Sequence, residues 1–264
     1  MAGVSASEPT YAKSVPGASQ GYAEWEAAGL RWLGEATAQG GARVVGVRDV
    51  APDRLLLDRL TPAPPSVAAA EEFGAGLAAT HLTGAPAWGA APPGWEGEGW
   101  FGPASDPLPL EVGEWSTWGE LYAVRLASLT RLAVDGGELT TAEAAEVDAL
   151  GEHCAAGDFD TSDTPARIHG DLWSGNVMWT PDGVVLIDPA AHGGHREADL
   201  AMLDLFGAPH LDRVHAAYRD AAPLDDGWEE RVGLHQLYPV LVHAVLFGGG
   251  YAGQAMRLVR ALGS

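Results

Sequence analysis

The most restrictive feature of the sequence is a set of polar residues around one apolar strand in residues 167–199. His169-Gly170-Asp171 opens the set, Asn176 follows the aspartate after four intervening residues, and Asp188 ends the apolar run VVLI. A kinase-type phosphotransferase needs one aspartate to accept a hydroxyl proton, and an asparagine and a second aspartate to hold Mg²⁺ on nucleotide phosphates. A carboxylate at the end of a buried strand is costly unless it binds a cation or is otherwise satisfied. We therefore predict kinase-type phosphoryl transfer; the alternative is that Asp171 and Asp188 only cap turns.

The length and the cysteine content limit the type of protein. The 264 residues suit one domain of two lobes or two small domains. No uninterrupted apolar run reaches the length of a membrane-spanning helix, and the N-terminus lacks the basic and apolar regions of a secretion signal. Cys154 is the only cysteine, so an internal disulfide or a cysteine-based metal site is excluded and a reducing cytoplasm is the expected location.

The charge balance is strongly acidic, with a formal net charge of −21. Nucleic acids and anionic membranes bind basic surfaces, so neither is an expected partner. A cationic or amine-bearing substrate is compatible with this charge, although an acidic surface also simply keeps a protein in solution.

Lys13 is the only lysine beside fourteen arginines. The lysine ammonium is a compact point charge that suits phosphate oxygens, and arginine does not replace it freely. We therefore interpret Lys13 as a phosphate ligand, with a stray surface lysine as the alternative.

The pattern of apolar residues predicts an α+β chain. A proline-rich linker is expected at 61–65, and the long stretch 83–113 is expected to be a functional loop without regular structure. The expected strands are 10–14, 43–50 and 54–60, and the expected helices are 21–38, 66–82, 116–133 and 140–156. A hairpin should follow Asn176, turning at 181–183. From Glu197 onward the pattern is helical, with expected interruptions at Pro209, Pro223, Pro239 and Gly248–Gly250.

Histidines near the polar set allow a second interpretation. His192 and His195, together with Asp188 and Asp199, could form a transition-metal site, but their spacing is loose and no HExxH pattern supports one. For His169 we favour a structural role, in which its ring holds the loop by hydrogen bonds, over a role as general base.

Three stretches of the chain resemble the fructosamine kinase family: HGDLWSGN, IDPAAHGGHREADLAMLDLFG and LHQLYPVLVHAVLFGGGY. Weaker similarity covers EAAGLRWL at 26–33, LAATH at 77–81 and WGELYAVRL at 118–126. The family consists of ketosamine 3-kinases with the aminoglycoside-phosphotransferase form of the protein-kinase-like fold. The resemblance implies a two-lobe α+β kinase-like fold, with a small β-rich N-lobe in residues 1–60 and a larger, mainly helical C-lobe in residues 61–264.

The resemblance also implies roles for individual residues. Asp171 would be the catalytic base, and Asn176 and Asp188 would be the Mg²⁺ ligands. Lys13 would contact the α- and β-phosphates of ATP, and Glu26 would be its partner on the following helix.

The resemblance also bears on the lysine partner, the adenine hinge and the residues that support the catalytic loop. Glu24 is a rival partner for the lysine, two residues before the matching glutamate. Strand 55–57 would lead into a hinge at Asp58 to Leu60, whose backbone pairs with adenine. Arg196 and Asp199 are expected to brace the catalytic loop and metal region rather than to contact substrate.

The implied substrates are ATP and a small sugar-amine, either free or carried on a glycated protein. The implied reaction phosphorylates the 3-hydroxyl of a ketosamine, which leads to deglycation because 3-phosphorylated ketosamines are unstable. One alternative is a kinase of another amine-bearing metabolite, such as an aminoglycoside or a choline-like alcohol. A second alternative is a nucleotide-binding pseudokinase.

Two departures from the family pattern bear on these expectations. Only residues 1–9 precede the lysine strand, where the family has a strand pair with a glycine-bearing turn, so we expect a shortened N-lobe with a weakened ATP site. The family usually has Tyr-Tyr-Gly-His-Arg-Glu where this chain has AHGGHRE at 191–197, so we expect an altered substrate pocket.

Overall fold

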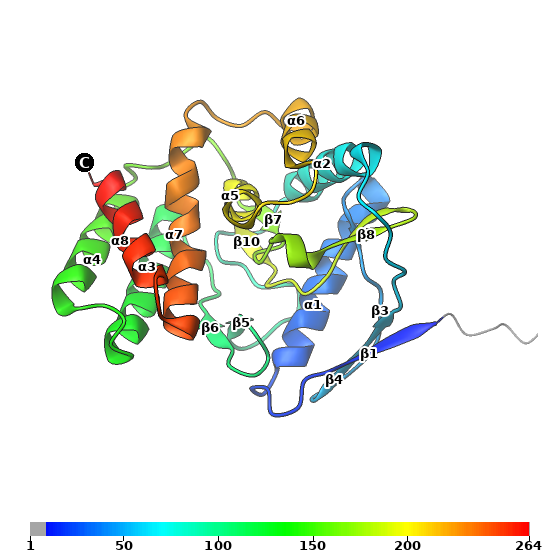
Figure 1. The fold of residues 1–264 in the computed structure, drawn as a ribbon, viewed down its shortest axis with the longest axis horizontal. Coiled ribbons are helices and arrows are strands. Elements are labelled where there is room, and N and C mark those ends of the chain that lie inside the picture. Colours follow the sequence, from blue (N-terminus) through cyan, green and yellow to red (C-terminus); the bar gives the residue numbers. More distant parts are fainter. Residues whose placement is uncertain (1–8, 264) are drawn as a thin grey trace, which may run out of the picture.

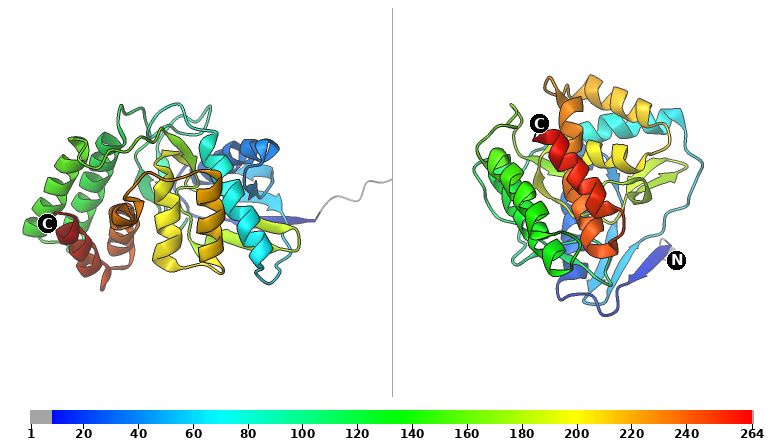
Figure 2. Two further views of the ribbon diagram at one scale, coloured as in Figure 1. Left: turned by 90° about the horizontal axis from the view of Figure 1, so that it is seen from above. Right: turned by 60° about the vertical axis from the view of Figure 1, so that its left-hand side comes forward.

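The computed structural model describes residues 9–263. Residues 1–8 and 264 lie outside the described residues, and the expectation of a shortened N-lobe falls mostly on that part of the chain. The molecule has two ends (Figures 1 and 2). The sheet that contains β1, β3 and β4 lies at one end, and helices α3, α4 and α8 lie at the other.

An antiparallel sheet and one helix form the N-terminal part. Its strands β1 (Thr10–Ser14), β3 (Val47–Ala51) and β4 (Arg54–Asp58) are ordered β1-β4-β3, and Lys13 lies opposite Leu55. Helix α1 (Tyr22–Glu35), followed by a 3₁₀ turn at Ala36–Gln39, packs its apolar face on this sheet. Leu30 and Leu55 are buried between them, which fixes α1 against β4, the strand that pairs with the Lys13 strand β1.

The prediction of one strand at 43–50 is wrong, because this segment forms two strands that belong to different sheets. Strand β2 (Arg43–Val44) pairs in parallel with β9 (Gly183–Leu186), which pairs antiparallel with β8 (Val177–Thr180). The chain changes sheet at Gly46, where an added Cβ would lie 2.1 Å from Oδ2 of Asp58. A side chain at position 46 would force the carboxylate of Asp58 to move, and a strand pattern read from the sequence does not reveal this close approach.

Side-chain caps begin the three middle helices, each within two residues of its predicted start. Ser66 caps α2 (Val67–Leu82) by accepting a hydrogen bond from the N–H of Ala69. Helices α3 (Trp118–Asp135) and α4 (Thr141–Ala155) both begin with a complete capping box, at Thr117 and Thr140.

The stretch 83–113 is not wholly irregular. It contains a short antiparallel hairpin of β5 (Gly99–Phe101) and β6 (Leu108–Leu110). Each strand has only three residues and β6 contains Pro109, so neither gives a recognisable alternation in the sequence. Phe101, Leu108 and Leu110 are nevertheless buried, which anchors the hairpin in the core.

The C-terminal half begins with β7 (Ala166–Ile168), which pairs with β10 (His192–Gly194). It continues through α5 (Arg196–Phe206), α6 (Leu211–Ala221), α7 (Trp228–Phe247) and α8 (Tyr251–Leu262). The predicted interruption at Pro239 is wrong, because α7 runs through this residue. Proline removes one backbone donor, but four successive residues of the helix, 238–241, are buried here, and packing outweighs that loss.

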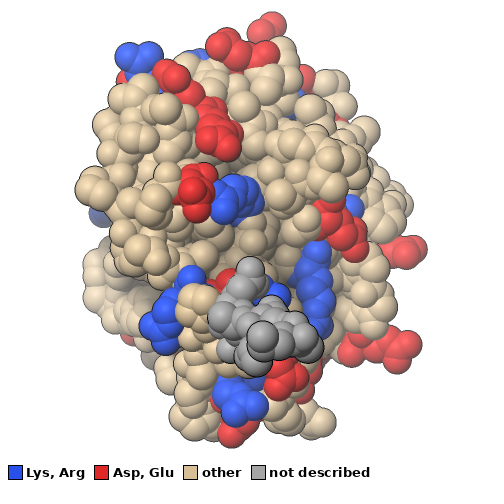
Figure 3. All heavy atoms as spheres, turned by 90° about the vertical axis from the view of Figure 1, so that its right-hand side faces the viewer, with Lys and Arg blue, Asp and Glu red and all other residues tan. Residues whose placement is uncertain are grey.

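On the face drawn in Figure 3, Lys and Arg side chains lie beside Asp and Glu side chains rather than in one basic field. Within residues 9–263, no helix combines the length and apolar composition needed to cross a membrane.

Candidate active site

Strand β1 and helix α1 bring Lys13 and two carboxylates together. The Nζ atom of Lys13 lies 2.7 Å from Oε2 of Glu26 and 3.0 Å from Oδ1 of Asp188. Glu26, and not the rival Glu24, is therefore the helix partner of the lysine. Burial would lower the pKa of Lys13, but the two carboxylates outweigh burial and raise this pKa above its ordinary value. The ammonium is thus charged and held in one position.

The loop after β7 presents Asp171 next to Asn176. The Nδ2 group of Asn176 donates to the backbone oxygen of Asp171 at 2.7 Å and to its Oδ2 at 3.1 Å. Burial raises the pKa of Asp171 to about 7, although the hydrogen bond from Asn176 acts in the opposite direction. A carboxyl group with a pKa near neutrality can accept and release a proton, which is what a general base requires.

Asp188 follows β9 in a backbone conformation that is uncommon for residues other than glycine. Its φ is 54°, in the left-handed region, and its side chain is 40% exposed. Strained residues of this kind are found at functional sites, where the surrounding structure holds them in place. In this conformation the carboxylate of Asp188 contacts Lys13, and its backbone oxygen lies 3.4 Å from Nδ2 of Asn176.

Buried Asp199 on α5 fixes the loop from behind. Its carboxylate accepts hydrogen bonds from the backbone N–H groups of His169 (2.7 Å) and Gly170 (2.9 Å) and from Nε2 of His81 (3.1 Å). Burial would raise the pKa of Asp199, but these donors, His81 first, lower it. The bracing predicted for Asp199 is present, and His81 in the LAATH stretch takes part in it, which the sequence alone does not indicate.

Among the described residues, His169 holds the loop as expected, whereas Arg196 does not. The structural role favoured for His169 agrees with its contacts, since its Nε2 lies 2.9 Å from the oxygen of Ile187 and its Nδ1 accepts from the N–H of Asp171. Within residues 9–263, the guanidinium of Arg196 makes its polar contacts away from the loop. Its Nε pairs with Asp163 at 2.7 Å and its other nitrogens donate to backbone oxygens at 222 and 223, so it braces a different segment.

The five residues Lys13, Glu26, Asp171, Asn176 and Asp188 line one cavity of about 450 Å³. The opposite walls are apolar and come from the loop after β5, from α5 and from α7. The functional loop predicted at 83–113 contributes residues 100–104, and the aromatic residues on α5 and α7 were not predicted. The predicted hinge residues lie at the end of β4 and do not line this cavity; the N–H of Asp58 donates to Gly46.

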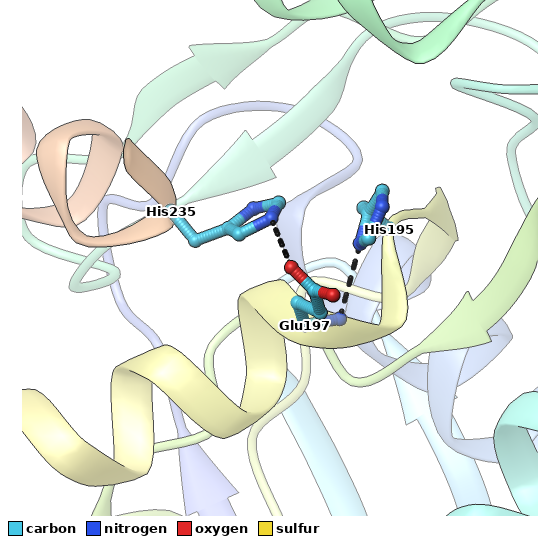
Figure 4. A group of neighbouring side chains, drawn as sticks. All are labelled: His195, Glu197 and His235. Atoms are coloured by element: carbon cyan, nitrogen blue, oxygen red, sulfur yellow. Dashed lines mark hydrogen bonds and ion pairs between the residues drawn. The ribbon is translucent and has the colours of Figure 1, made fainter. Parts of the chain in front are cut away.

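The expected alternative, a metal site at His192 and His195, is not assembled. His192 is hydrogen-bonded through Nε2 to the guanidinium of Arg125 at 2.7 Å, which leaves no lone pair on that nitrogen for a cation. The core instead contains a cluster of His195, Glu197 and His235 (Figure 4). Arg231 binds both carboxylate oxygens of Glu197 at 2.6 and 2.9 Å, so this cluster is a buried ion-pair network.

Comparisons with known proteins agree with this architecture. A family model described as "Fructosamine kinase" matches residues 9–263. A "Probable ketoamine kinase" of Synechocystis sp. is 34% identical over 195 residues, which are 71% of this chain and 60% of that protein. The crystal structure of a "putative fructosamine-3-kinase" from Thermobifida fusca superposes with a TM-score of 0.87 at 44% identity, covering 97% of this chain and 85% of that one.

A more distant structure supports the fold alone. The aminoglycoside phosphotransferase APH(4)-Ia has a TM-score of 0.56 at 17% identity, over 97% of this chain and 92% of its own. The predicted α+β, kinase-like fold is thus confirmed. Because the family model spans all of the described residues, the chain belongs to the fructosamine kinase family.

Proposed function

We propose that the protein is an ATP- and Mg²⁺-dependent kinase that phosphorylates the 3-hydroxyl of small ketosamines, as a step of deglycation. The observation that carries this proposal is the convergence of Lys13, Asp171, Asn176 and Asp188 on one cavity. The names of the relatives, a ketoamine kinase and a fructosamine-3-kinase, support the choice of substrate.

Asp171 would orient the substrate hydroxyl and accept its proton as the oxygen attacks the γ-phosphorus of ATP and ADP leaves. Lys13, held by Glu26 at 2.7 Å, would bind phosphate oxygens. Most of the rate enhancement would come from position and electrostatics, since the protein forms no covalent bond in this scheme.

The donor atoms suit Mg²⁺. Asn176 uses Nδ2 for its hydrogen bonds to the loop, so its Oδ1 is the amide atom left for a cation. Asp188 is partly exposed and offers a carboxylate on the same side of the cavity. Oxygen ligands of this type fit Mg²⁺, which would neutralise charge on the phosphates when bound.

The division into lobes completes the proposal. Residues 1–60 would cover the nucleotide and residues 61–264 would supply the catalytic loop and the sugar-amine site. Backbone groups near Asp58 and Leu60 remain our candidates for adenine. The single buried cysteine supports a reducing cytoplasm as the location. Free sugar-amines and glycated proteins are both retained as substrates.

The test is Mg²⁺-dependent ATP turnover with a fructosamine and a ribulosamine, with the product identified by ³¹P NMR. Asp171→Asn should lower kcat by about 10²- to 10⁴-fold, the range for loss of a general base. Asp182→Asn, on the exposed β8–β9 turn, is the matched control and should keep full activity. Binding of ATP without turnover of any sugar-amine would favour the pseudokinase alternative, and a fully active Asp171→Asn variant would disprove the proposed base.

A further inference from the structure

Four ring-bearing side chains form a continuous surface along one side of the candidate active site. They are Trp173, Phe206, His243 and Phe247, and we call them the aromatic wall. Successive ring centroids are 6.1, 5.2 and 5.4 Å apart, so each ring contacts the next. All four line the cavity that contains Asp171.

Three of the four rings in the aromatic wall are apolar and yet open to solvent. Trp173 is 41% exposed, Phe206 37% and Phe247 61%, and the three come from a loop, α5 and α7. Single exposed apolar residues are ordinary, but a contiguous set that lines a cavity marks a binding surface. The ring of His243 is fixed in this set because its Nδ1 donates to the backbone oxygen of Pro239 at 2.7 Å.

The position of the wall relative to Asp171 indicates which part of a ligand it contacts. Trp173 lies two residues after Asp171, so the wall begins beside the predicted base and extends outward to Phe247 on α7. In a ketosamine, the 3-hydroxyl and the amine nitrogen are separated by only a few bonds. A substrate with that hydroxyl at Asp171 can therefore place the group on its nitrogen along the wall.

The charges in the cavity indicate the chemistry of that group. The charged lining residues are Lys13 and the three carboxylates of Glu26, Asp171 and Asp188, and the wall itself contains no acid, lysine or arginine. Lys13 is already paired with Glu26 and Asp188. A carboxylate on the substrate would thus find no lysine or arginine along the wall and would face the three carboxylates of the cavity.

We propose that the aromatic wall binds the substituent on the amine nitrogen of the sugar-amine, and that it selects aromatic or alkyl substituents over carboxylate-bearing ones. The inference rests on the proposed function, since it assigns one part of the proposed substrate. The wall acts by stacking and apolar burial, so it discriminates among amines that carry the same sugar.

The test compares adducts of one ketose with benzylamine, methylamine and glycine. The wild-type protein should show a kcat/KM about tenfold higher for the benzylamine adduct than for the methylamine adduct, and the lowest value for the glycine adduct. Phe247→Ala and, separately, Phe206→Ala should lower kcat/KM for the benzylamine adduct about five- to tenfold and leave the methylamine adduct unchanged. Leu82→Ala, at a 65% exposed position on α2 outside the cavity, is the control.

Two results would overturn the inference. One is an equal loss for the benzylamine and methylamine adducts in Phe247→Ala and Phe206→Ala. The other is a selective rise of KM for ATP in these variants, which would place the nucleotide at the wall instead.

Calorimetric Kd values for the same adducts separate this inference from the proposed function. Preferential binding of the benzylamine adduct that is lost in Phe247→Ala supports the wall even if no adduct is phosphorylated. Turnover without any preference refutes the wall and leaves the kinase intact. If no adduct binds or turns over, both proposals fall.

Discussion

Replacing Asp199 by asparagine tests whether the buried carboxylate holds the loop that carries Asp171. The change keeps the shape of the side chain but removes its charge and replaces one acceptor oxygen by an NH₂ group. Asp199 is 1% exposed and accepts from His169, Gly170 and His81, so at least one of these buried donors must lose its acceptor. A hydrogen bond to a charged group contributes about 1.5–3 kcal/mol, and breaking a buried pair costs about 3–5 kcal/mol. We expect Asp199→Asn to lower the free energy of unfolding by about 3–5 kcal/mol.

Urea unfolding followed by tryptophan fluorescence measures this loss, since the chain has ten tryptophans. Asp204→Asn is the matched control on the same helix. The carboxylate of Asp204 is 28% exposed and pairs with His215 at 2.8 Å, so its removal should lower the free energy of unfolding by less than about 1 kcal/mol. In the proposed reaction, the loosened loop should also lower kcat about 100-fold, because small displacements of a catalytic group have effects of this size.

The result that would refute the reasoning is specific. A free energy of unfolding for Asp199→Asn within about 1 kcal/mol of the wild type would mean that the backbone N–H groups of His169 and Gly170 find other partners. The loop would then be held by the chain around it, and the role assigned to Asp199 would be incorrect.

Three further predictions concern single side chains. Lys13→Met should raise KM for ATP and lower kcat in the proposed reaction, and unchanged kinetics would remove the lysine from the nucleotide site. Burial would raise the pKa of Glu197, but hydrogen bonds from His235 and Arg231 outweigh burial and lower this pKa to about 2. The carboxylate therefore stabilises the fold by about 3 kcal/mol above its unfolded pKa of about 4.5, and this stabilisation is lost as the pH falls towards 2. In urea titrations, the difference in the free energy of unfolding between the wild type and Glu197→Gln should be widest at about pH 7 and should narrow below about pH 4.5. Gly119→Ala should lower the thermal midpoint, because its Cβ would lie 1.9 Å from a backbone oxygen of α4, whereas Gly34→Ala in α1, with nothing within 4 Å of its Cβ, should raise stability by about 0.5–1 kcal/mol.

The parts of the site that are close in sequence could be predicted without a structure. Asp171 and Asn176 lie on one loop, and Asp188 follows at the end of the adjacent hairpin, so local geometry brings them together. The pairing of Lys13 with Glu26 needed the family resemblance, because nothing in the spacing selects Glu26 over a neighbouring glutamate.

The aromatic wall could not be predicted in this way. Its members come from a loop and two separate helices, and no periodicity connects them. The sequence indicates that Phe206 and Phe247 are apolar, but only the packing of α5 against α7 places them on one surface beside Asp171. Pro239 was misjudged for a related reason, since helix breaking was inferred from propensity and the surrounding burial was not visible.

The pairing of β2 with β9 has a consequence for biosynthesis. Arg43 of β2 donates a hydrogen bond to the backbone oxygen of Asp182, 139 residues further along the chain. At ribosomal speeds of about 5–20 residues per second, β9 is synthesised on the order of 10 s after its partner strand β2. During that interval the first sixty residues have an unpaired strand and are exposed to misassociation, so we expect a nascent chain that depends on chaperones until β9 emerges. The same event brings Asp188 to Lys13, and the lysine made first therefore acquires this partner only after most of the chain has been synthesised.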